Sequence, residues 1–180
     1  MNFNKNNKDN INLGQLVGKL QKEDNRYSNL CKGLKPIYWV LIPIYAIMAI
    51  DAYIESKEIN DLFAGLCFVG CFLIFALVLG NFQKEFKTVD YSLPTLSMLK
   101  KAAERYKPFR PKSFLAFAAF FLMDAGFYLS SHFNNYAVKF QIYFIALFFV
   151  SVAIGLVIWY IRYKPLRDNA LRLIAEIEGE

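Results

Sequence analysis

The chain has 180 residues, of which 56% are hydrophobic, 17% aromatic and 20% charged, and its formal net charge is +6 at pH 7. A soluble domain is usually about 45–50% apolar, and 18 Phe and 11 Tyr exceed what a soluble core of this size needs. The apolar residues form long blocks and the charged residues lie between them. This segregation excludes an ordinary soluble domain and predicts an all-α integral membrane protein.

Residues 1–35 are predicted to form a cytoplasmic N-terminal amphipathic segment. The first ten residues are polar, so no cleavable signal peptide is expected, and the first membrane helix would serve as an uncleaved signal anchor. Apolar side chains then recur at helical spacing, although the stripe is interrupted between Leu20 and Tyr27. The stripe consists of Leu13, Leu16, Val17, Leu20, Tyr27, Leu30, Cys31 and Leu34.

A first transmembrane hairpin is predicted over residues 36–82, with helices near 36–54 and 62–82. The second of these helices carries no charge in its apolar part after Asp61, and it is long enough to cross a hydrocarbon core of about 30 Å. The first helix contains Asp51 near its outer end, and we expect its internal Pro43 to kink it.

The central segment, residues 83–112, is predicted to be a basic cytoplasmic loop that contains a helix over 92–107. Ser92 is the expected N-cap and Pro94 the expected first-turn residue. An apolar stripe follows along this helix. It consists of Leu96, Leu99, Ala103 and Tyr106.

A second transmembrane hairpin is predicted over residues 113–161, with helices near 113–131 and 140–161. Asp124 lies inside the first of them, and a carboxylate in hydrocarbon is costly and often functional. If Asp124 shared a cavity with Asp51, the pKa of one carboxyl would rise, which suits proton or cation coupling.

The alternative role of Asp124 is structural, as a hydrogen-bond partner of a neighbouring helix. The candidate donors for such a bond are Tyr45, Tyr128, Tyr143 and Ser151.

The tail, residues 162–180, is predicted to be cytoplasmic and to contain a helix over 165–178, with Pro165 marking a break or kink after the membrane helix. Its apolar stripe, like the other two, must be covered. The cytoplasmic helices could pack on one another, lie on the membrane or dock a partner. The docking candidates are Leu96, Leu99, Ala103, Tyr106, Leu173, Ile174 and Ile177.

The distribution of basic residues predicts the orientation. All 21 Lys and Arg residues except Lys57 and Lys139 lie in the three segments assigned to the cytoplasm. The positive-inside rule therefore places both termini and the central loop in the cytoplasm. The lipid bilayer is the expected environment and nucleic acid is not an expected partner, since the charges flank membrane segments.

The two hairpins show a weak internal similarity. Lys35-Pro36 precedes Asp51-Ala52, and Lys107-Pro108 precedes Asp124-Ala125, at nearly the same spacing. Either a duplicated hairpin or chance similarity between apolar helices would explain this pattern.

The remaining motifs are uninformative about chemistry. Cys67 and Cys71 share a helix face, where they could ligate a metal or respond to oxidation, but close packing of small residues is the favoured interpretation. His132, the single histidine, is expected in an exposed outer loop. No phosphate loop, HExxH, CxxC or GxSxG is present. We therefore expect no enzyme, no cofactor and no metal.

The stretch VDYSLPTLSMLKKAAERYKPFR, residues 89–110, lies between the two hairpins. With the hairpin layout and the short charged tail, it resembles a group of small four-helix bacterial inner-membrane proteins of uncharacterised activity. Some of those look like neighbours of extracytoplasmic sigma-factor genes. The resemblance implies a bacterial inner-membrane location and favours a regulatory or adaptor role, and it transfers no catalytic residue.

These features lead to two functional hypotheses. The first is a membrane-embedded adaptor that docks a cytoplasmic or membrane protein, or a further copy of itself, through its apolar stripes. The second is a small proton- or cation-coupled transporter that acts as an oligomer through Asp124 and Asp51.

Overall fold

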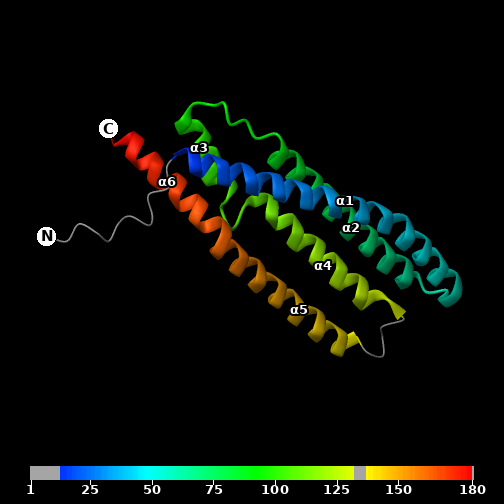
Figure 1. Cartoon of the computed structure of the whole chain (residues 1–180). Helices are drawn as coiled ribbons and strands as arrows, with labels where there is room; N and C mark the ends of the chain where they lie inside the picture. Colours follow the sequence, from blue (N-terminus) through cyan, green and yellow to red (C-terminus); the bar gives the residue numbers. More distant parts are fainter. Residues whose placement is uncertain (1–12, 132–136, 180) are drawn as a thin grey trace.

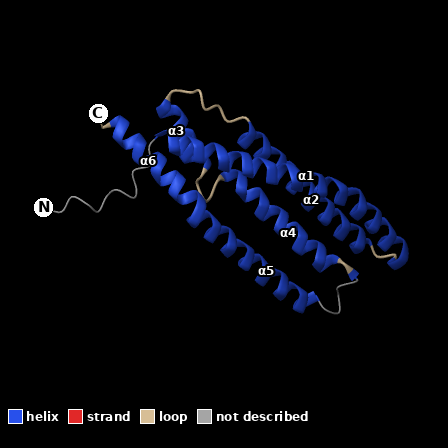
Figure 2. Cartoon of the chain, viewed as in Figure 1, coloured by secondary structure: helices blue, strands red, loops and turns tan. Residues whose placement is uncertain are grey.

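A computed structural model describes residues 13–131 and 137–179. The described residues are almost entirely helical and include no β-strand (Figure 2). In chain order the elements are α1 (Leu13–Ser56), α2 (Ile59–Lys87), α3 (Thr95–Arg105), the 3₁₀ turn η1 (Pro111–Ser113), α4 (Phe114–Leu129), α5 (Ala137–Ile158), the π-helical turn η3 (Trp159–Tyr163) and α6 (Lys164–Glu178).

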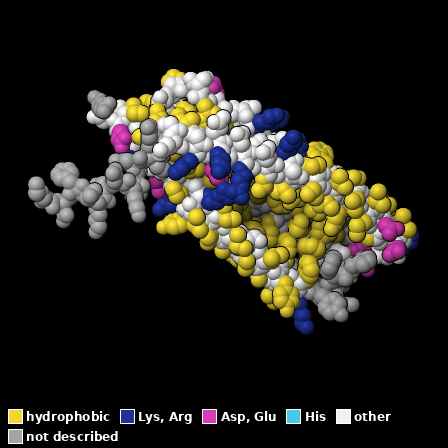
Figure 3. Space-filling model, viewed as in Figure 1, with side chains coloured by type: hydrophobic (Ala, Val, Ile, Leu, Met, Phe, Trp, Pro, Cys, Tyr) yellow, Lys and Arg dark blue, Asp and Glu magenta, His cyan; other side chains and the backbone are white. Residues whose placement is uncertain are grey.

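Four helical stretches of the described chain are long and apolar enough to cross a membrane. They are Leu13–Ser56, Ile59–Lys87, Pro111–Leu129 and Val138–Glu178. Figure 3 shows hydrophobic side chains covering the part of the surface that α4 and α5 occupy, with lysines and arginines where this surface meets the polar end. The chain is therefore a helical multi-pass membrane protein, as the sequence predicted.

Two of the membrane-spanning stretches continue as helix well beyond the predicted membrane segments. The expected boundary between residues 35 and 36 falls inside α1, which runs without interruption through Pro36 and Pro43. At the other end, α5 continues through η3 into α6, and Pro165 occupies the first turn of α6, where its missing N–H does no harm. Two continuous rods therefore extend from the apolar region to the polar end of the molecule (Figure 1).

Helix α3 begins later than the sequence predicted. Its N-cap position is Pro94 and its first residue is Thr95, so the assignment of Ser92 as N-cap is wrong. Ser92 instead donates from its backbone N–H (2.9 Å) and its hydroxyl (2.6 Å) to the Asp90 carboxylate. Asp90 thus forms a local turn with Ser92 before the helix starts.

Helices α1 and α2 approach each other very closely at one point. The Cα of Gly65 on α2 faces Ala49 on α1, and a methyl group on Gly65 would lie 1.9 Å from the Ala49 Cβ. Gly126 of α4 packs against the Phe68 ring and the Ala64 backbone oxygen of α2. Small residues at both contacts bring the three backbones together, as is usual for membrane helices.

Helix α5 is held to α4 by aromatic rings. Phe117 lies 5.7 Å from Phe148, Phe120 lies 4.7 Å from Phe144, and Phe127 lies 4.5 Å from Phe140, measured between ring centroids. None of residues 138–158 of α5, for which burial is described, is buried. Bulky rings therefore keep these two backbones apart, unlike the close contact between α1 and α2.

The polar end of the molecule has its own hydrophobic core, which we call the terminal bundle. It is formed by the first turns of α1, the last turn of α2, α3 and α6, which lie together at one end in Figure 1. The buried side chains are Leu16, Leu20, Phe86, Met98, Leu99, Ala102, Ala103, Tyr106, Leu166, Ala170 and Ile174. Of the three ways to cover the apolar stripes, the chain uses packing of the stripes on one another.

We predict that Gly65→Ala destabilises the protein by about 1–3 kcal/mol, because the added methyl group must push α1 away from α2. The matched control is Gly155→Ala on α5, where an added Cβ meets no atom within 4 Å. Thermal unfolding in detergent checks this pair. Equal melting temperatures for the two variants would contradict the close contact.

Candidate functional site

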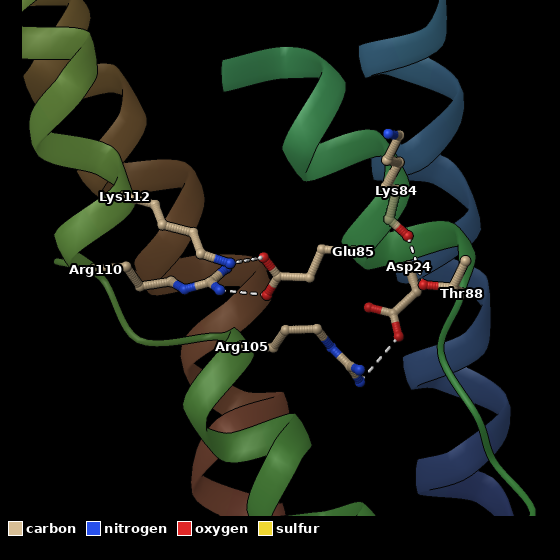
Figure 4. Close-up of polar contacts among 7 residues, drawn as sticks. All are labelled: Asp24, Lys84, Glu85, Thr88, Arg105, Arg110 and Lys112. Carbon is tan, nitrogen blue, oxygen red and sulfur yellow. Dashed lines mark hydrogen bonds and ion pairs between the residues drawn. The ribbon is translucent and has the colours of Figure 1, made fainter. Parts of the chain in front are cut away.

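The best-defined polar constellation of the chain surrounds Asp24 in the terminal bundle. The Asp24 carboxylate accepts hydrogen bonds from the hydroxyls of Tyr91 and Tyr106. Nη2 of Arg105 lies 3.1 Å from Asp24 Oδ2, and the two side chains are only 9% and 2% exposed (Figure 4). Both carboxylate oxygens are therefore engaged by donors that come from α3 and its flanking residues.

Burial governs the electrostatics of this cluster. Burial and the neighbouring Asp24 carboxylate raise the pKa of Tyr91 and of Tyr106 well above the ordinary value, so both phenols keep the protons that they donate. A buried carboxylate without such partners would be very costly. The Nε atom of Arg105 is also buried and has no hydrogen-bond partner among the described residues.

The residue before Asp24 binds a different neighbour. Nη2 of Arg162, in η3, donates to Glu23 Oε1 at 2.6 Å and to Oε2 at 2.9 Å. Consecutive residues on an α-helix point about 100° apart, so Glu23 and Asp24 reach η3 and α3 separately. The indole of Trp159, also in η3, donates to the backbone oxygen of Tyr106 at 2.8 Å. Together these bonds connect α1, α3 and the α5–α6 rod.

A second ionic cluster joins the end of α2 to the start of α4. The carboxylate of Glu85 binds Nη2 of Arg110 and lies 3.2 Å from Nζ of Lys112, as Figure 4 shows. The Arg110 guanidinium also lies 5.7 Å from the centre of the Phe82 ring, within the range of a cation–π contact. Thr88 ends α2 by donating its hydroxyl to the Lys84 backbone oxygen at 2.8 Å.

These clusters are suited to holding helices together. Both oxygens of Asp24 are bonded to donors of the chain, and the side chain is only 2% exposed, so the carboxylate is engaged in contacts between helices. Among the residues that the structure describes, no three His, Cys, Asp or Glu side chains are placed to hold a metal ion. The geometry fits a structural lock better than a reaction centre.

The predicted docking residues lie mostly inside the terminal bundle. Four of them are buried: Leu99, Ala103, Tyr106 and Ile174. Leu96 and Leu173 are partly buried against the same core. Ile177 alone is exposed, at 42%. The stripes as a whole are therefore occupied by internal packing, and docking through them would require the bundle to open.

The two predicted ion-coupling residues have different surroundings. Asp51 is exposed and lines a cavity formed by α1, α2 and the end of α4, whereas Asp124 is not among the residues around that cavity. Asp124 is half-buried on α4, and its Oδ1 atom is buried without a hydrogen-bond partner in the described part of the chain. Of the donors proposed for it, Tyr128 and Tyr143 are largely exposed. The hydroxyl of Ser151 bonds to the Leu147 backbone oxygen instead.

The cavity that Asp51 lines, called here the distal cavity, lies at the end of the molecule opposite the terminal bundle. Its volume is about 340 Å³, and Glu55, Asp61 and Phe68 are also among its lining residues. Asp61 is buried and accepts hydrogen bonds from the backbone N–H (2.8 Å) and hydroxyl (2.7 Å) of Ser131. The predicted loop residue His132 lies outside the described residues.

Sequence reasoning missed Asp24, although a signal was present. The apparent gap in the first apolar stripe between Leu20 and Tyr27 is occupied by Asp24, which is four residues after one and three residues before the other. A carboxylate at a stripe position faces the core, so it must be paired there. Its partners are more than sixty residues away in sequence, and no local pattern identifies them.

We predict that Asp24→Asn destabilises the terminal bundle by about 3–5 kcal/mol, since it leaves the buried Arg105 cation without its partner. The control is Glu104→Gln, which removes the exposed ion pair between Glu104 and Lys107 and should cost at most about 1 kcal/mol. Limited proteolysis and thermal unfolding of the full chain measure both effects. Similar losses in the two variants would show that the Asp24 cluster does not hold the bundle.

Comparison with known proteins finds no matching family model, no matching curated protein and no matching solved structure. Function is therefore inferred from the chain's own residues and their geometry.

Proposed function

We propose that the protein is a multi-pass bacterial inner-membrane protein that acts as an interaction or regulatory adaptor without catalytic activity. In this proposal the helices form two transmembrane hairpins, both termini are cytoplasmic, and the terminal bundle is the element that a partner protein recognises. The observation that carries the proposal is the bundle itself, a packed unit built on the ends of the membrane helices.

The orientation is supported by the charges around the bundle. Three segments contribute to the bundle: residues 1–35, 83–112 and 162–180. They contain 19 of the 21 Lys and Arg residues, and the other two are Lys57 and Lys139. Basic segments stay on the cytoplasmic side during insertion. Lys57 follows α1 at the opposite end of the molecule, and Lys139 lies in the first turn of α5.

A docking role is supported by how firmly the bundle is attached. Helix α1 carries Leu16, Leu20 and Asp24 into the bundle, and the α5–η3–α6 rod carries Arg162 and Ala170. Tertiary packing and buried ionic contacts make a rigid surface, and rigid surfaces bind partners with little loss of conformational entropy. The buried apolar stripes form the core that supports this surface.

The surface that remains for a partner includes the outer face of α6. Asp168, Leu171, Ala175 and Glu178 are exposed and recur at helical spacing on this face. Leu171 is 41% exposed between the two acidic residues. Asp168 pairs with Lys164 and Glu178 pairs with Lys100, so Leu171 is the side chain on this face that suits an apolar pocket of a partner.

We predict that Leu171→Glu abolishes stoichiometric capture of the partner from mild detergent while the melting temperature stays unchanged, because Leu171 contacts solvent. The control is Gln21→Glu, an exposed change of the same charge on α1. The double variant Leu96→Asp with Leu99→Asp tests folding instead, since Leu99 is fully buried. Undiminished capture by Leu171→Glu would remove this face from the proposal.

One observation favours a second candidate, a small proton- or cation-coupled transporter that works as an oligomer. The Oδ1 atom of Asp124 is buried on a membrane helix without a hydrogen-bond partner among the described residues. A buried, unsatisfied carboxylate oxygen in a membrane helix is a frequent mark of an ion pathway. Asp51 would act separately in this mechanism, at the distal cavity.

We predict for this candidate that Asp124→Asn stops uptake of protons or monovalent cations into liposomes that contain the full chain, without lowering its melting temperature. Asp51→Asn on the exposed part of α1 is the matched substitution, and it should reduce transport less. If Asp124→Asn changes only the stability, Asp124 has a structural role and the transporter candidate fails.

A further inference from the structure

The distal cavity combines two kinds of wall. Its volume of about 340 Å³ falls within the range of small-molecule sites, roughly 300–1,000 Å³. Tyr45, Phe68 and Phe127 form an aromatic wall, with centroid distances of 5.5 Å between the first two rings and 5.0 Å between the last two. These contacts fix the positions of the rings against one another before anything binds.

The cavity lining also contains acidic side chains. Asp51 and Glu55 line the cavity from α1, and their spacing of four residues places them on one face of the helix. Neither makes an ion pair with a described residue, and like charges at this spacing repel each other. Asp61 also lines the cavity, but its carboxylate is already bound by Ser131. Figure 3 shows acidic side chains gathered at this end of the molecule.

This combination selects one class of ligand. An inorganic cation prefers a closed shell of several oxygen ligands, whereas the aromatic wall presents mainly ring carbon, with the Tyr45 hydroxyl as its one side-chain oxygen. An organic ammonium ion is attracted to aromatic ring faces and to carboxylates together, and its apolar body can replace water against the rings. An anion would meet Asp51 and Glu55 directly.

We propose that the distal cavity binds a monovalent organic cation, an ammonium group attached to an apolar body. Asp51 and Glu55 neutralise the charge, while Tyr45, Phe68 and Phe127 hold the body. The ligand could be a free lipophilic cation or a lipid with an amine headgroup, since both present this chemistry. The proposal concerns a site far from the terminal bundle, so it stands or falls independently of partner capture.

The test uses ethidium, an aromatic organic cation whose fluorescence anisotropy reports binding. The full chain in a non-ionic maltoside detergent should bind ethidium saturably. Asp51→Asn combined with Glu55→Gln should raise the Kd about tenfold or more through loss of the charge contacts. The control is Glu58→Gln, which removes a nearby exposed carboxylate that does not line the cavity and should leave the Kd unchanged.

Two further measurements separate cavity binding from general charge attraction. Ala52 lines the cavity, so Ala52→Phe should fill part of it and weaken ethidium binding while both carboxylates remain. Neutral phenanthridine, which has a similar ring system, should not compete. The proposal is overturned if the double variant, or Ala52→Phe with an unchanged melting temperature, binds ethidium as the wild type does, or if phenanthridine competes equally.

Short-chain lipids identify the source of the ligand. Displacement of ethidium by dihexanoyl phosphatidylethanolamine, but not by dihexanoyl phosphatidylglycerol, would support an amine headgroup as the occupant. Displacement by neither would support a free lipophilic cation. Equal displacement by both would mean that acyl chains fill the cavity, and it would overturn the proposal.

Discussion

One buried carboxylate sets the arrangement of the polar end of this protein. Asp24 faces the core of the terminal bundle, and its ionised form is tolerable there only if donors surround it. Those donors are Tyr91, Arg105 and Tyr106, which flank or end α3. The short helix α3 is therefore held against α1 by a polar requirement as well as by apolar contacts. Because Tyr106 also receives the Trp159 indole at its backbone oxygen, the same cluster fixes the α5–α6 rod.

The two ends of α1 connect features that lie far apart. Its first turns supply the buried residues of the terminal bundle, and its last turns supply Asp51 and Glu55 to the distal cavity. Hydrogen bonds between successive turns keep a continuous helix stiff, so a shift of one end along the helix axis also shifts the other end. α1 and α2 are also in tight contact through Gly65 and Ala49. Helix α1 thus contributes side chains both to the distal cavity and to the terminal bundle.

The helical class and the four apolar spans could be predicted because both depend on local composition. Long charge-free runs such as that in α5 have few alternatives to a membrane helix. Helix ends were harder to predict, because the membrane segments were expected to begin at residue 36 and to end at residue 161, whereas α1 and the α5–α6 rod continue through these positions. The polar clusters could not be predicted from the sequence, because their partners are distant along the chain. Asp24 pairs with residues of a different segment, and Asp61 pairs with Ser131, seventy positions away. The apolar stripes were identified correctly as residues that must be covered. Sequence spacing alone does not say whether another helix, the membrane or a partner protein covers them.

The π-helical turn at Trp159–Tyr163 controls the phase of the whole α6 helix. In this turn the Lys164 backbone N–H bonds to the Trp159 oxygen, five residues earlier, so the turn holds one residue more than an α-helical turn. Each residue of an α-helix advances the side-chain direction by about 100°. If this turn became regular α-helix with every residue kept, the extra residue would rotate the face that carries Leu166, Ala170 and Ile174 by about 100°, away from α3. The extra residue thus brings a membrane helix and a bundle helix, each with its own apolar period, into register on one rod.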